Sequence, residues 1–247
     1  MTQLRNIQAL VNGNILVAED DQVVQLVLGK MFERAGYKVD FTHDGSEAIS
    51  ALKLKDYDLV VMDCMMPEMD GFAATRFIRS GKSNEIDPDI PIIAMTGLST
   101  TNDINKCREA GMNSHVNKPV DSRELITAIE QYLGSTLEGV STRSQGAEYG
   151  EHAWDDEFLD TIIDKFLADV PEVLTQLQQA GERGDLTRLR QLGHRVRGAA
   201  DILGTTTLSS RACALEQAGN TEEIKHMSRL ASELTDELQK LTTILTD

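Results

Sequence analysis

The stretch Ile15-Leu16-Val17-Ala18-Glu19-Asp20-Asp21 passes directly from a short apolar run to three consecutive carboxylates. The apolar part hardly alternates with polar residues, which is typical of a parallel strand buried on both faces. A second stretch, Leu59-Val60-Val61-Met62-Asp63, has the same form and also ends on a carboxylate. Two such strands predict a sheet with acidic residues gathered at the carboxyl ends of its strands.

Short apolar runs alternate with amphipathic stretches from Asn14 to Gly134, and this alternation predicts strand-helix units around a parallel sheet. Gly36, Gly81 and Gly111 each follow a predicted helix, where a left-handed cap needs no Cβ. The fold class expected here is α/β, a doubly wound sheet of five parallel strands. We expect strands at 15–18, 38–41, 59–62, 92–95 and 115–117, and helices at 23–35, 46–54, 72–80, 103–110 and 122–133.

The composition changes after Leu133 to small polar residues, which predicts a linker. Beyond it, apolar residues such as Ile162 and Phe166 recur with helical spacing, which predicts a second, all-α domain. Predicted breaks at Pro171, 181–185, 204–205 and 219–221 indicate a four-helix bundle in up-and-down order. The expected division is a leader at 1–12, a first domain at 13–134, a linker at 135–152 and a second domain at 153–247.

Length and charge restrict the class of protein. The 247 residues suit two modest domains, and 24 Lys and Arg against 40 Asp and Glu give a net charge of −16. That charge argues against a direct nucleic-acid partner. The longest apolar runs are far too short to span a membrane and no signal peptide is evident, so we expect no membrane segment and a cytoplasmic location. Cys64, Cys107 and Cys213 are widely spaced without a Cys-x-x-Cys pair, which favours three reduced thiols.

The residues that follow the strands predict a metal site and a reaction. Carboxylates at Glu19, Asp20 and Asp63 would repel one another unless a divalent cation neutralised them, and Mg²⁺ prefers oxygen ligands. Thr96 and Lys118 follow two further strands, and a phosphoryl group can be bound by a metal, a cation and a neutral donor together. Asp63 would then be the nucleophile that accepts a phosphoryl group as an acyl phosphate.

Four motifs occur in one order: residues 15–21, Asp63-Cys64-Met65-Met66-Pro67-Glu68-Met69-Asp70-Gly71, Met95-Thr96-Gly97 and Asn117-Lys118-Pro119. Together they resemble the receiver domain of two-component response regulators over residues 13–134. The resemblance implies a flavodoxin-like sheet of order 2-1-3-4-5 and a Mg²⁺ cofactor. Gly97 stands where the family usually has Ala, and Glu19 replaces the commoner Asp, although neither change removes a reacting group.

The resemblance also implies a role for each motif residue. Asp63 would be the phosphoacceptor, and Glu19 and Asp20 the acidic pair at the metal, with Asp20 the more direct ligand. Met65 would lend a backbone carbonyl to the metal, Thr96 and Lys118 would contact the phosphoryl group, and a cis bond would precede Pro119. His115 occupies the place of the aromatic switch residue. Taken alone, Lys118 would be a loop lysine, and an N-cap role for Asp20 and an ordinary strand position for His115 stay open as alternatives.

The predicted helix at 186–203 carries a second candidate site. Its apolar residues, such as Leu192 and Val196, face the bundle, which places His194 on the opposite, outward-facing side. Arg197 and Gly198 lie one turn away, so a cation and a bare helix surface flank the imidazole. A neutral imidazole is a nucleophile, and neighbouring cations can bind phosphoryl oxygens. Six arginines suggest a local basic patch: Arg183, Arg188, Arg190, Arg195, Arg197 and Arg211.

The pattern His194-Arg195-Val196-Arg197-Gly198, followed by Leu203-Gly204, Leu208 and Leu215-Glu216, is similar to the histidine phosphotransfer (HPt) domain over residues 153–247. The resemblance implies a four-helix bundle with His194 phosphorylatable, and Arg197 takes the place of the usual Lys. Taken alone, His194 could be an ordinary exposed histidine and Gly198 a packing glycine where helices cross.

Together the two resemblances imply a phosphorelay intermediate, with a sensor histidine kinase and receiver or HPt domains as partners. The sequence has no Gly-x-x-x-x-Gly-Lys-Ser/Thr loop and no Asp-x-Gly-x-Gly segment, so we do not expect it to phosphorylate itself from ATP. A free-standing relay protein and the end of a hybrid sensor kinase both remain open. An aspartyl phosphatase is disfavoured because Met65 stands where a second Asp is expected, and a non-catalytic signalling scaffold is the other alternative.

Overall fold

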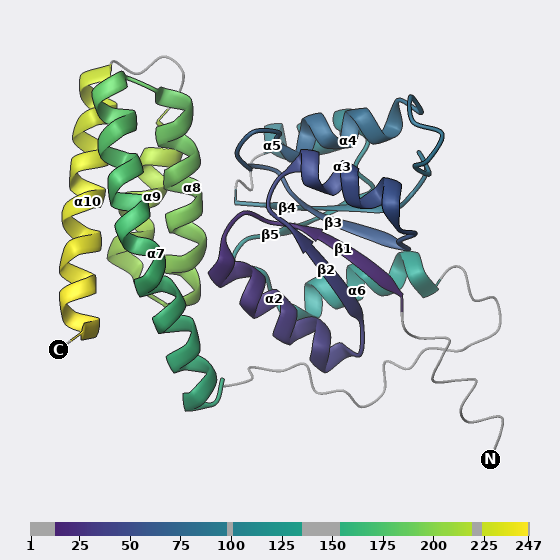
Figure 1. Ribbon diagram of the computed structural model, residues 1–247, viewed down its shortest axis with the longest axis horizontal. Coiled ribbons are helices and arrows are strands. Elements are labelled where there is room, and N and C mark those ends of the chain that lie inside the picture. The colour runs from purple at the N-terminus through teal and green to yellow at the C-terminus, as the bar shows by residue number, and fades with distance from the viewer. Residues whose placement is uncertain (1–12, 98–100, 135–153, 219–223, 247) are drawn as a thin grey trace. The chain divides into compact units, whose positions relative to one another are not determined.

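The computed structural model describes residues 13–97, 101–134, 154–218 and 224–246, and the chain divides into two compact units. The first contains the mixed strands and helices up to Gly134, and the second contains the helices that follow Trp154 (Figure 1). The expected leader at 1–12 and linker at 135–152 lie outside the described residues.

The first unit is a five-stranded parallel sheet of order β2-β1-β3-β4-β5, which confirms the predicted fold class and strand order. Each strand is one residue longer than its predicted range, and Asp63 and Thr96 are themselves the last residues of β3 and β4. In chain order the elements are β1 Asn14–Ala18, α2 Gln22–Ala35, β2 Lys38–Thr42, α3 Gly45–Leu54, β3 Leu59–Asp63, α4 Gly71–Arg79, β4 Ile92–Thr96, α5 Thr101–Ala110, β5 Ser114–Asn117 and α6 Ser122–Leu133.

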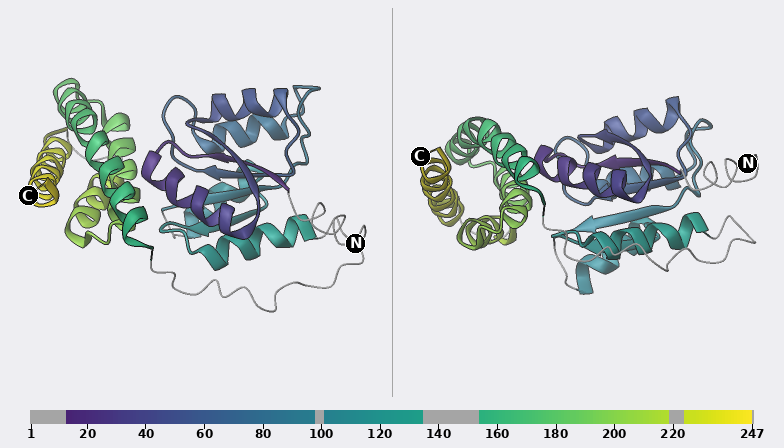
Figure 2. Two further views of the ribbon diagram at one scale, coloured as in Figure 1. Left: turned by 60° about the horizontal axis from the view of Figure 1, so that its bottom comes forward. Right: turned by 90° about the horizontal axis from the view of Figure 1, so that it is seen from below.

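Helices cover both faces of this sheet, with α3, α4 and α5 on one face and α2 and α6 on the other (Figures 1 and 2). All residues of β3 and β4 are buried, which explains why these strands do not alternate apolar and polar residues. An apolar cluster fills the space between the sheet and α3, α4 and α5 and includes Leu16, Val60, Met62 and Ile92.

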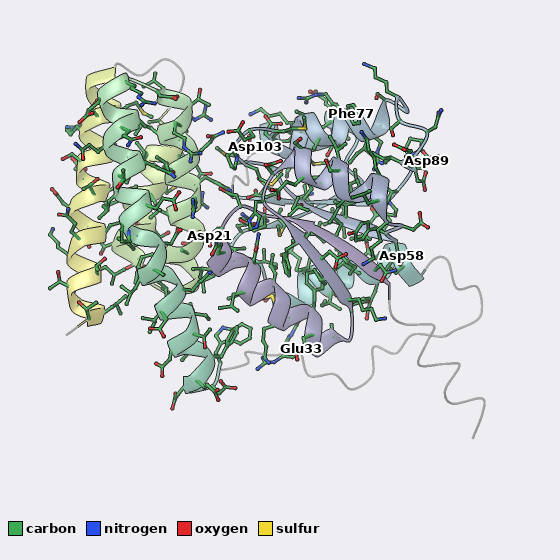
Figure 3. All side chains as sticks on the ribbon, viewed as in Figure 1. Asp21, Glu33, Asp58, Phe77, Asp89 and Asp103 are labelled. Atoms are coloured by element: carbon green, nitrogen blue, oxygen red, sulfur yellow. The ribbon has the colours of Figure 1, made fainter. Side chains whose placement is uncertain are left out.

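Local capping fixes where the helices start and end. The Asp70 side chain accepts a hydrogen bond from the amide of Ala73 at the start of α4. The Asp121 side chain accepts hydrogen bonds from two amides at the start of α6. Gly111, which follows α5, has φ +98°, the left-handed conformation expected of it. At the other edge of the sheet, Asp58 and Asn14 exchange hydrogen bonds of 2.7 and 2.8 Å that join the starts of β1 and β3 (Asp58 is labelled in Figure 3).

The second unit consists, among its described residues, of four helices: α7 Asp156–Arg183, α8 Leu186–Ile202, α9 Thr206–Gln217 and α10 Ile224–Thr246. The predicted helical spacing is confirmed, since Ile162, Phe166 and Val170 of α7 are buried with Leu234 and Leu238 of α10. The predicted all-α second domain is therefore confirmed.

The predicted break at Pro171 is wrong, because α7 continues through this residue. Proline lacks the amide that an inner helix turn uses and usually kinks or ends a helix. Here Phe166 and Val170 before the proline and Val173 and Leu177 after it are all buried, so packing holds both halves in one helix. Tertiary burial has outweighed the local preference.

Candidate functional site

Three carboxylates gather where β1 and β3 end. Glu19 follows β1, Asp63 ends β3, and these two strands are paired neighbours, so chain topology brings the acids together. Both side chains are almost fully buried, at 1% and 0% exposure. Glu19, Asp20 and Asp63 each offer an oxygen within 4.8 Å of the others, and we call these three residues the acidic cluster.

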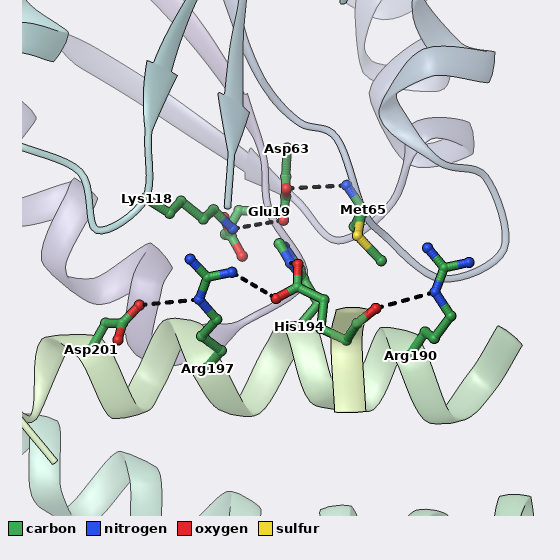
Figure 4. A network of polar contacts seen from close by, with 9 residues as sticks. Glu19, Asp63, Met65, Lys118, Arg190, His194, Arg197 and Asp201 are labelled. Carbon is green, nitrogen blue, oxygen red and sulfur yellow. Dashed lines mark hydrogen bonds and ion pairs between the residues drawn. The ribbon is translucent and has the colours of Figure 1, made fainter. Parts of the chain in front are cut away.

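Lys118 provides the positive charge beside the acidic cluster. Its Nζ lies 2.7 Å from Glu19 Oε2 and 2.7 Å from Asp63 Oδ2, so one ammonium bridges two buried carboxylates (Figure 4). The Lys118 amide donates to the carbonyl of Thr96 at 2.8 Å, which ties the end of β5 to the end of β4. The Lys118–Pro119 peptide bond is cis, as expected.

The charges in this cluster perturb one another. The pKa of Glu19 is raised to about 8, because burial and, to a smaller extent, the nearby Asp63 and Asp20 raise it by more than Lys118 lowers it. Burial lowers the pKa of Lys118, but Asp63 and Glu19 more than reverse this, so its pKa lies above the ordinary value and the ammonium stays charged. If a bound cation kept all three carboxylates ionised, they and the one ammonium would give the site a formal charge of −2. A set of hard oxygen donors with this charge fits a divalent cation such as Mg²⁺.

The remaining predicted residues of the first unit lie at the same edge of the sheet. Thr96 ends β4 and is buried, and the amide of Met65 donates to Asp63 Oδ1 at 3.1 Å. His115 is half-buried on β5, opposite Ala94 of β4, and its role as a switch stays a prediction. The same holds for the Met65 carbonyl as a metal ligand.

The structure places Asp21, and not Asp20, at the start of α2. Asp21 Oδ1 accepts the amides of Val23 and Val24 at 2.7 and 2.9 Å, which is the role of a helix N-cap. Asp20 belongs instead to the acidic cluster. The N-cap alternative for Asp20 is thereby removed.

Gly71 is a further residue of this site. In the sequence it was recognised only as part of the motif at 63–71, without a role of its own. A Cβ at Gly71 would lie 2.0 Å from the carbonyl oxygen of Asp63 and 2.9 Å from Met62 Cγ. No side chain fits in that space, so α4 can approach the end of β3 only because position 71 is glycine. The residue therefore helps to fix the main chain that carries Asp63.

In the second unit, His194 of α8 lies beside Glu216 of α9. Nδ1 of His194 is 2.8 Å from Glu216 Oε1, and the other carboxylate oxygen accepts from Arg197 at 2.8 Å. Arg197 also lies 3.6 Å from Asp201, and Arg190 donates to the main-chain carbonyl of Glu216 (Figure 4). Burial raises the pKa of Glu216, but His194 and Arg197 lower it by more, so the carboxyl is held ionised.

In the second unit, His194 contacts Glu216 of α9, and the prediction that its ring faces outward from the bundle stays a prediction. α9 packs closely on α8 at Gly193. A Cβ there would lie 2.9 Å from both Ala212 O and the amide of Glu216, so only glycine allows this approach. From the sequence, Gly198 was the glycine considered as a possible packing position between helices. It is half-buried on α8, whereas Gly193 is the position where α8 and α9 meet.

Three of the six arginines of the predicted basic patch pair with carboxylates of the second unit, namely Arg195, Arg197 and Arg211. Arg188 donates to Gln176 and Gln191, and Arg195 pairs with Asp169 at 2.5 Å. Arg211 pairs with Glu233. Arg188 and Arg190 bond to neutral groups and keep their charge, so a basic patch here stays a prediction. Of the six, Arg197 shares a carboxylate with His194.

Comparison with protein families assigns both units. The response regulator receiver domain family matches residues 15–130, and the Hpt domain family matches residues 161–243. The chain contains a receiver domain followed by an Hpt domain. The matched ranges lie within the boundaries expected from the sequence. The acidic cluster belongs to the receiver domain, and His194 with Glu216 belongs to the Hpt domain.

The chain is similar to parts of several longer proteins. It is 31% identical over 205 residues to the sensor protein EvgS of Escherichia coli, covering 82% of this chain and 17% of that protein. It is 40% identical over 128 residues to hybrid signal transduction histidine kinase B of Dictyostelium discoideum, covering 48% of this chain and 6% of the relative. The chain thus spans a small part of the length of the curated relatives that it matches.

Among solved structures, the chain resembles the receiver domain of a sensor histidine kinase from Pseudomonas aeruginosa, which has a magnesium ion coordinated in its active-site cleft. The two are 36% identical, with a TM-score of 0.46, covering 50% of this chain and 98% of the other. Within the described residues, no helix has both the length and the apolar character needed to cross a membrane. The cytoplasmic location stays a prediction.

Proposed function

We propose that this chain carries phosphoryl groups in a phosphorelay, with Asp63 of the receiver domain and His194 of the Hpt domain as the two carriers. The observation that carries the proposal is the setting of Asp63, whose buried carboxylate contacts Lys118 and shares a cluster with Glu19 and Asp20. A carboxylate held this way can accept a phosphoryl group through positioning and charge neutralisation.

In the receiver domain, a carboxylate oxygen of Asp63 forms the new bond to phosphorus while the bond from phosphorus to the donor breaks. The donor atom keeps the electron pair, so a phosphohistidine donor returns to neutral imidazole after proton exchange with solvent. Lys118 neutralises the added negative charge, and Thr96 supplies a hydroxyl at the adjacent strand end. Glu19, Asp20 and Asp63 would hold Mg²⁺, with Met65 adding its carbonyl, and the ion would neutralise phosphoryl oxygens.

In the Hpt domain, the contact with Glu216 determines which ring nitrogen reacts. An ionised carboxylate only accepts hydrogen bonds, so Nδ1 of His194 carries the proton and donates it to Glu216. In the neutral ring Nε2 is then the basic nitrogen, and we propose it as the atom that bonds to phosphorus. Arg197, which already shares Glu216 with the ring, is the nearby cation for the phosphoryl oxygens.

Labelling with acetyl phosphate tests the proposal. The full chain is incubated with labelled acetyl phosphate and Mg²⁺, and the stability of the label to acid and base is measured. We expect one primary label with the base lability of an acyl phosphate, lost in Asp63→Asn and in excess chelator. Asp89→Asn, which changes an exposed aspartate of the same domain, is the matched control and keeps the label.

The Hpt step is tested with a cognate sensor kinase and a downstream receiver. Loss of downstream transfer in His194→Gln, with Asp63 still labelled, supports the assignment, and His226→Gln on α10 is the matched control. A label that persists in Asp63→Asn but disappears in His194→Gln would contradict Asp63 as the entry point. Absence of any label under all of these conditions would favour the alternative of a signalling scaffold.

The partners follow from the same proposal. A sensor histidine kinase would supply the phosphoryl group to Asp63, and a receiver aspartate or an Hpt histidine of another relay protein would exchange it with this chain. Since the family matches contain no ATP-binding kinase domain and the sequence has no nucleotide-binding loop, we propose a phosphotransfer intermediate and not a kinase.

A further inference from the structure

Two of the three cysteines meet in the receiver domain although they are far apart in the sequence. Cys64 directly follows β3, Cys107 lies on α5, and their Sγ atoms are 3.8 Å apart. Both side chains are 4% exposed and belong to the apolar cluster between the sheet and its α3, α4 and α5 layer. We infer that Cys64 and Cys107 form a redox-sensitive pair that a hydroperoxide converts to an intrachain disulfide.

The geometry requires only a small movement. A disulfide has its sulfur atoms about 2.0 Å apart, so the 3.8 Å separation must close by about 1.8 Å, shared between two side chains. Rotation about χ1 closes part of this distance, and the main chain around Cys64 moves toward α5 to close the rest. The pair lies within a single unit, so its formation does not depend on any contact with the Hpt domain.

The chemistry balances with a hydroperoxide as the oxidant. One thiol takes an oxygen atom from the O–O bond of hydrogen peroxide and becomes a sulfenic acid, and one water leaves. The second thiol attacks that sulfur, the S–S bond forms, and a second water leaves. Two thiols lose two electrons in total and one O–O bond is reduced. Because both sulfurs are buried, the oxidant enters during local opening of α5.

The position of Cys64 gives the disulfide a consequence for the site, which rests on the function proposed above. Cys64 is bonded through its main chain to Asp63 and Met65, and its amide donates to Met95 of β4 at 3.1 Å. Formation of the disulfide draws the main chain around Cys64 toward α5. This movement disturbs the arrangement in which the amide of Met65 donates to Asp63. Displacement of a reacting group by about 1 Å can cost about a hundredfold in rate, so we expect roughly tenfold slower phosphorylation of Asp63.

The test uses the full chain with Cys213→Ser, which leaves the pair as its two thiols. The chain is treated with hydrogen peroxide, remaining thiols are alkylated, and intact mass and unreduced peptides are analysed. We expect both thiols to disappear together, a peptide joining positions 64 and 107, and reversal by dithiothreitol. Separate oxidation of the two cysteines without that peptide, or two thiols that still alkylate after peroxide, would overturn the inference.

The rate of labelling by acetyl phosphate then measures the effect of the disulfide on phosphorylation of Asp63. The oxidised chain is expected to label roughly tenfold more slowly than the reduced chain, with recovery after dithiothreitol, whereas Cys107→Ser in the same background shows no such change. A disulfide that forms without altering the labelling rate would overturn the link to phosphorylation. If the reduced chain takes no label, the proposed function fails, while the peptide analysis still decides whether the disulfide exists.

Discussion

Replacing Lys118 by methionine should reveal how strongly the acidic cluster depends on a cation. The change removes the ammonium that lies 2.7 Å from both Glu19 and Asp63, whose side chains are 1% and 0% exposed. With all three carboxylates ionised, the formal charge of the site would change from −2 to −3. Removing one partner of a buried ion pair costs about 3–5 kcal/mol, because the remaining charge is neither solvated nor paired. We expect a loss of that size in the receiver domain at neutral pH without metal.

Magnesium should recover much of this loss. A ligand at a hundred times its dissociation constant stabilises the folded state by about 2.7 kcal/mol, and the more negative site should bind the ion more tightly. Hydrogen exchange of peptides from β1 and β3, measured against urea concentration with and without Mg²⁺, reports on this domain alone. Lys82→Met, which removes an exposed lysine, is the matched control. A Lys118→Met chain as stable as the wild type in chelator, or equal stabilisation of both by Mg²⁺, would refute the reasoning.

Three further perturbations have defined outcomes. Without metal, the receiver domain should lose stability as pH rises from about 4.5 to about 8, by up to about 1.4 kcal/mol per pH unit, because the folded pKa of Glu19 is raised. Glu19→Gln should flatten that profile in urea unfolding, and equal profiles would contradict the assignment. The folded pKa of Glu216 is lowered, so its contribution to the Hpt domain is present above about pH 4.5 and is lost as pH falls through the folded pKa. Glu216→Gln should weaken this acid dependence in hydrogen exchange of α8 and α9, and an unchanged profile would argue against the His194 contact. Gly193→Ala should destabilise the Hpt domain by about 1–3 kcal/mol through its clash with α9, whereas Gly181→Ala, with no atom within 4 Å, should stabilise it by about 0.5–1 kcal/mol. The stability of the Hpt domain in each variant is measured by thermal unfolding monitored by hydrogen exchange. Equal changes in stability for Gly193→Ala and Gly181→Ala would contradict the packing argument.

The sequence predicted the sheet well because each strand combines an unbroken apolar run with a polar residue at its end. β3 and β4 are buried throughout, so hydrophobicity alone located them, and their order fixed the neighbours of Asp63. The acidic cluster followed from this, since parallel strands place their carboxyl ends at one edge. The residues Asp20 and Asp21 were harder to separate, because two adjacent acids have the same chemistry and only the backbone direction decides which one caps α2.

Long-range contacts between helices were not predictable from periodicity. A helical pattern shows which face is apolar but not which neighbouring helix approaches most closely, so the close approach of α9 at Gly193 was missed. Glu216 was visible only as part of a motif, since nothing local indicates that it reaches across to His194. The approach of Cys64 to Cys107 depends in the same way on where α5 lies relative to the residue that follows β3. Pro171 shows the opposite error, where a strong local signal was outweighed by burial on both sides.

Chemical identification of the phosphorylated residue tests the central claim most directly. Borohydride reduces an aspartyl phosphate to homoserine, so the full chain is treated with acetyl phosphate and Mg²⁺, reduced and analysed by peptide mass spectrometry. The account predicts homoserine at position 63, absent when Mg²⁺ is chelated. Homoserine at a different acidic residue, or an unmodified Asp63 in a chain that carries the label, would contradict it.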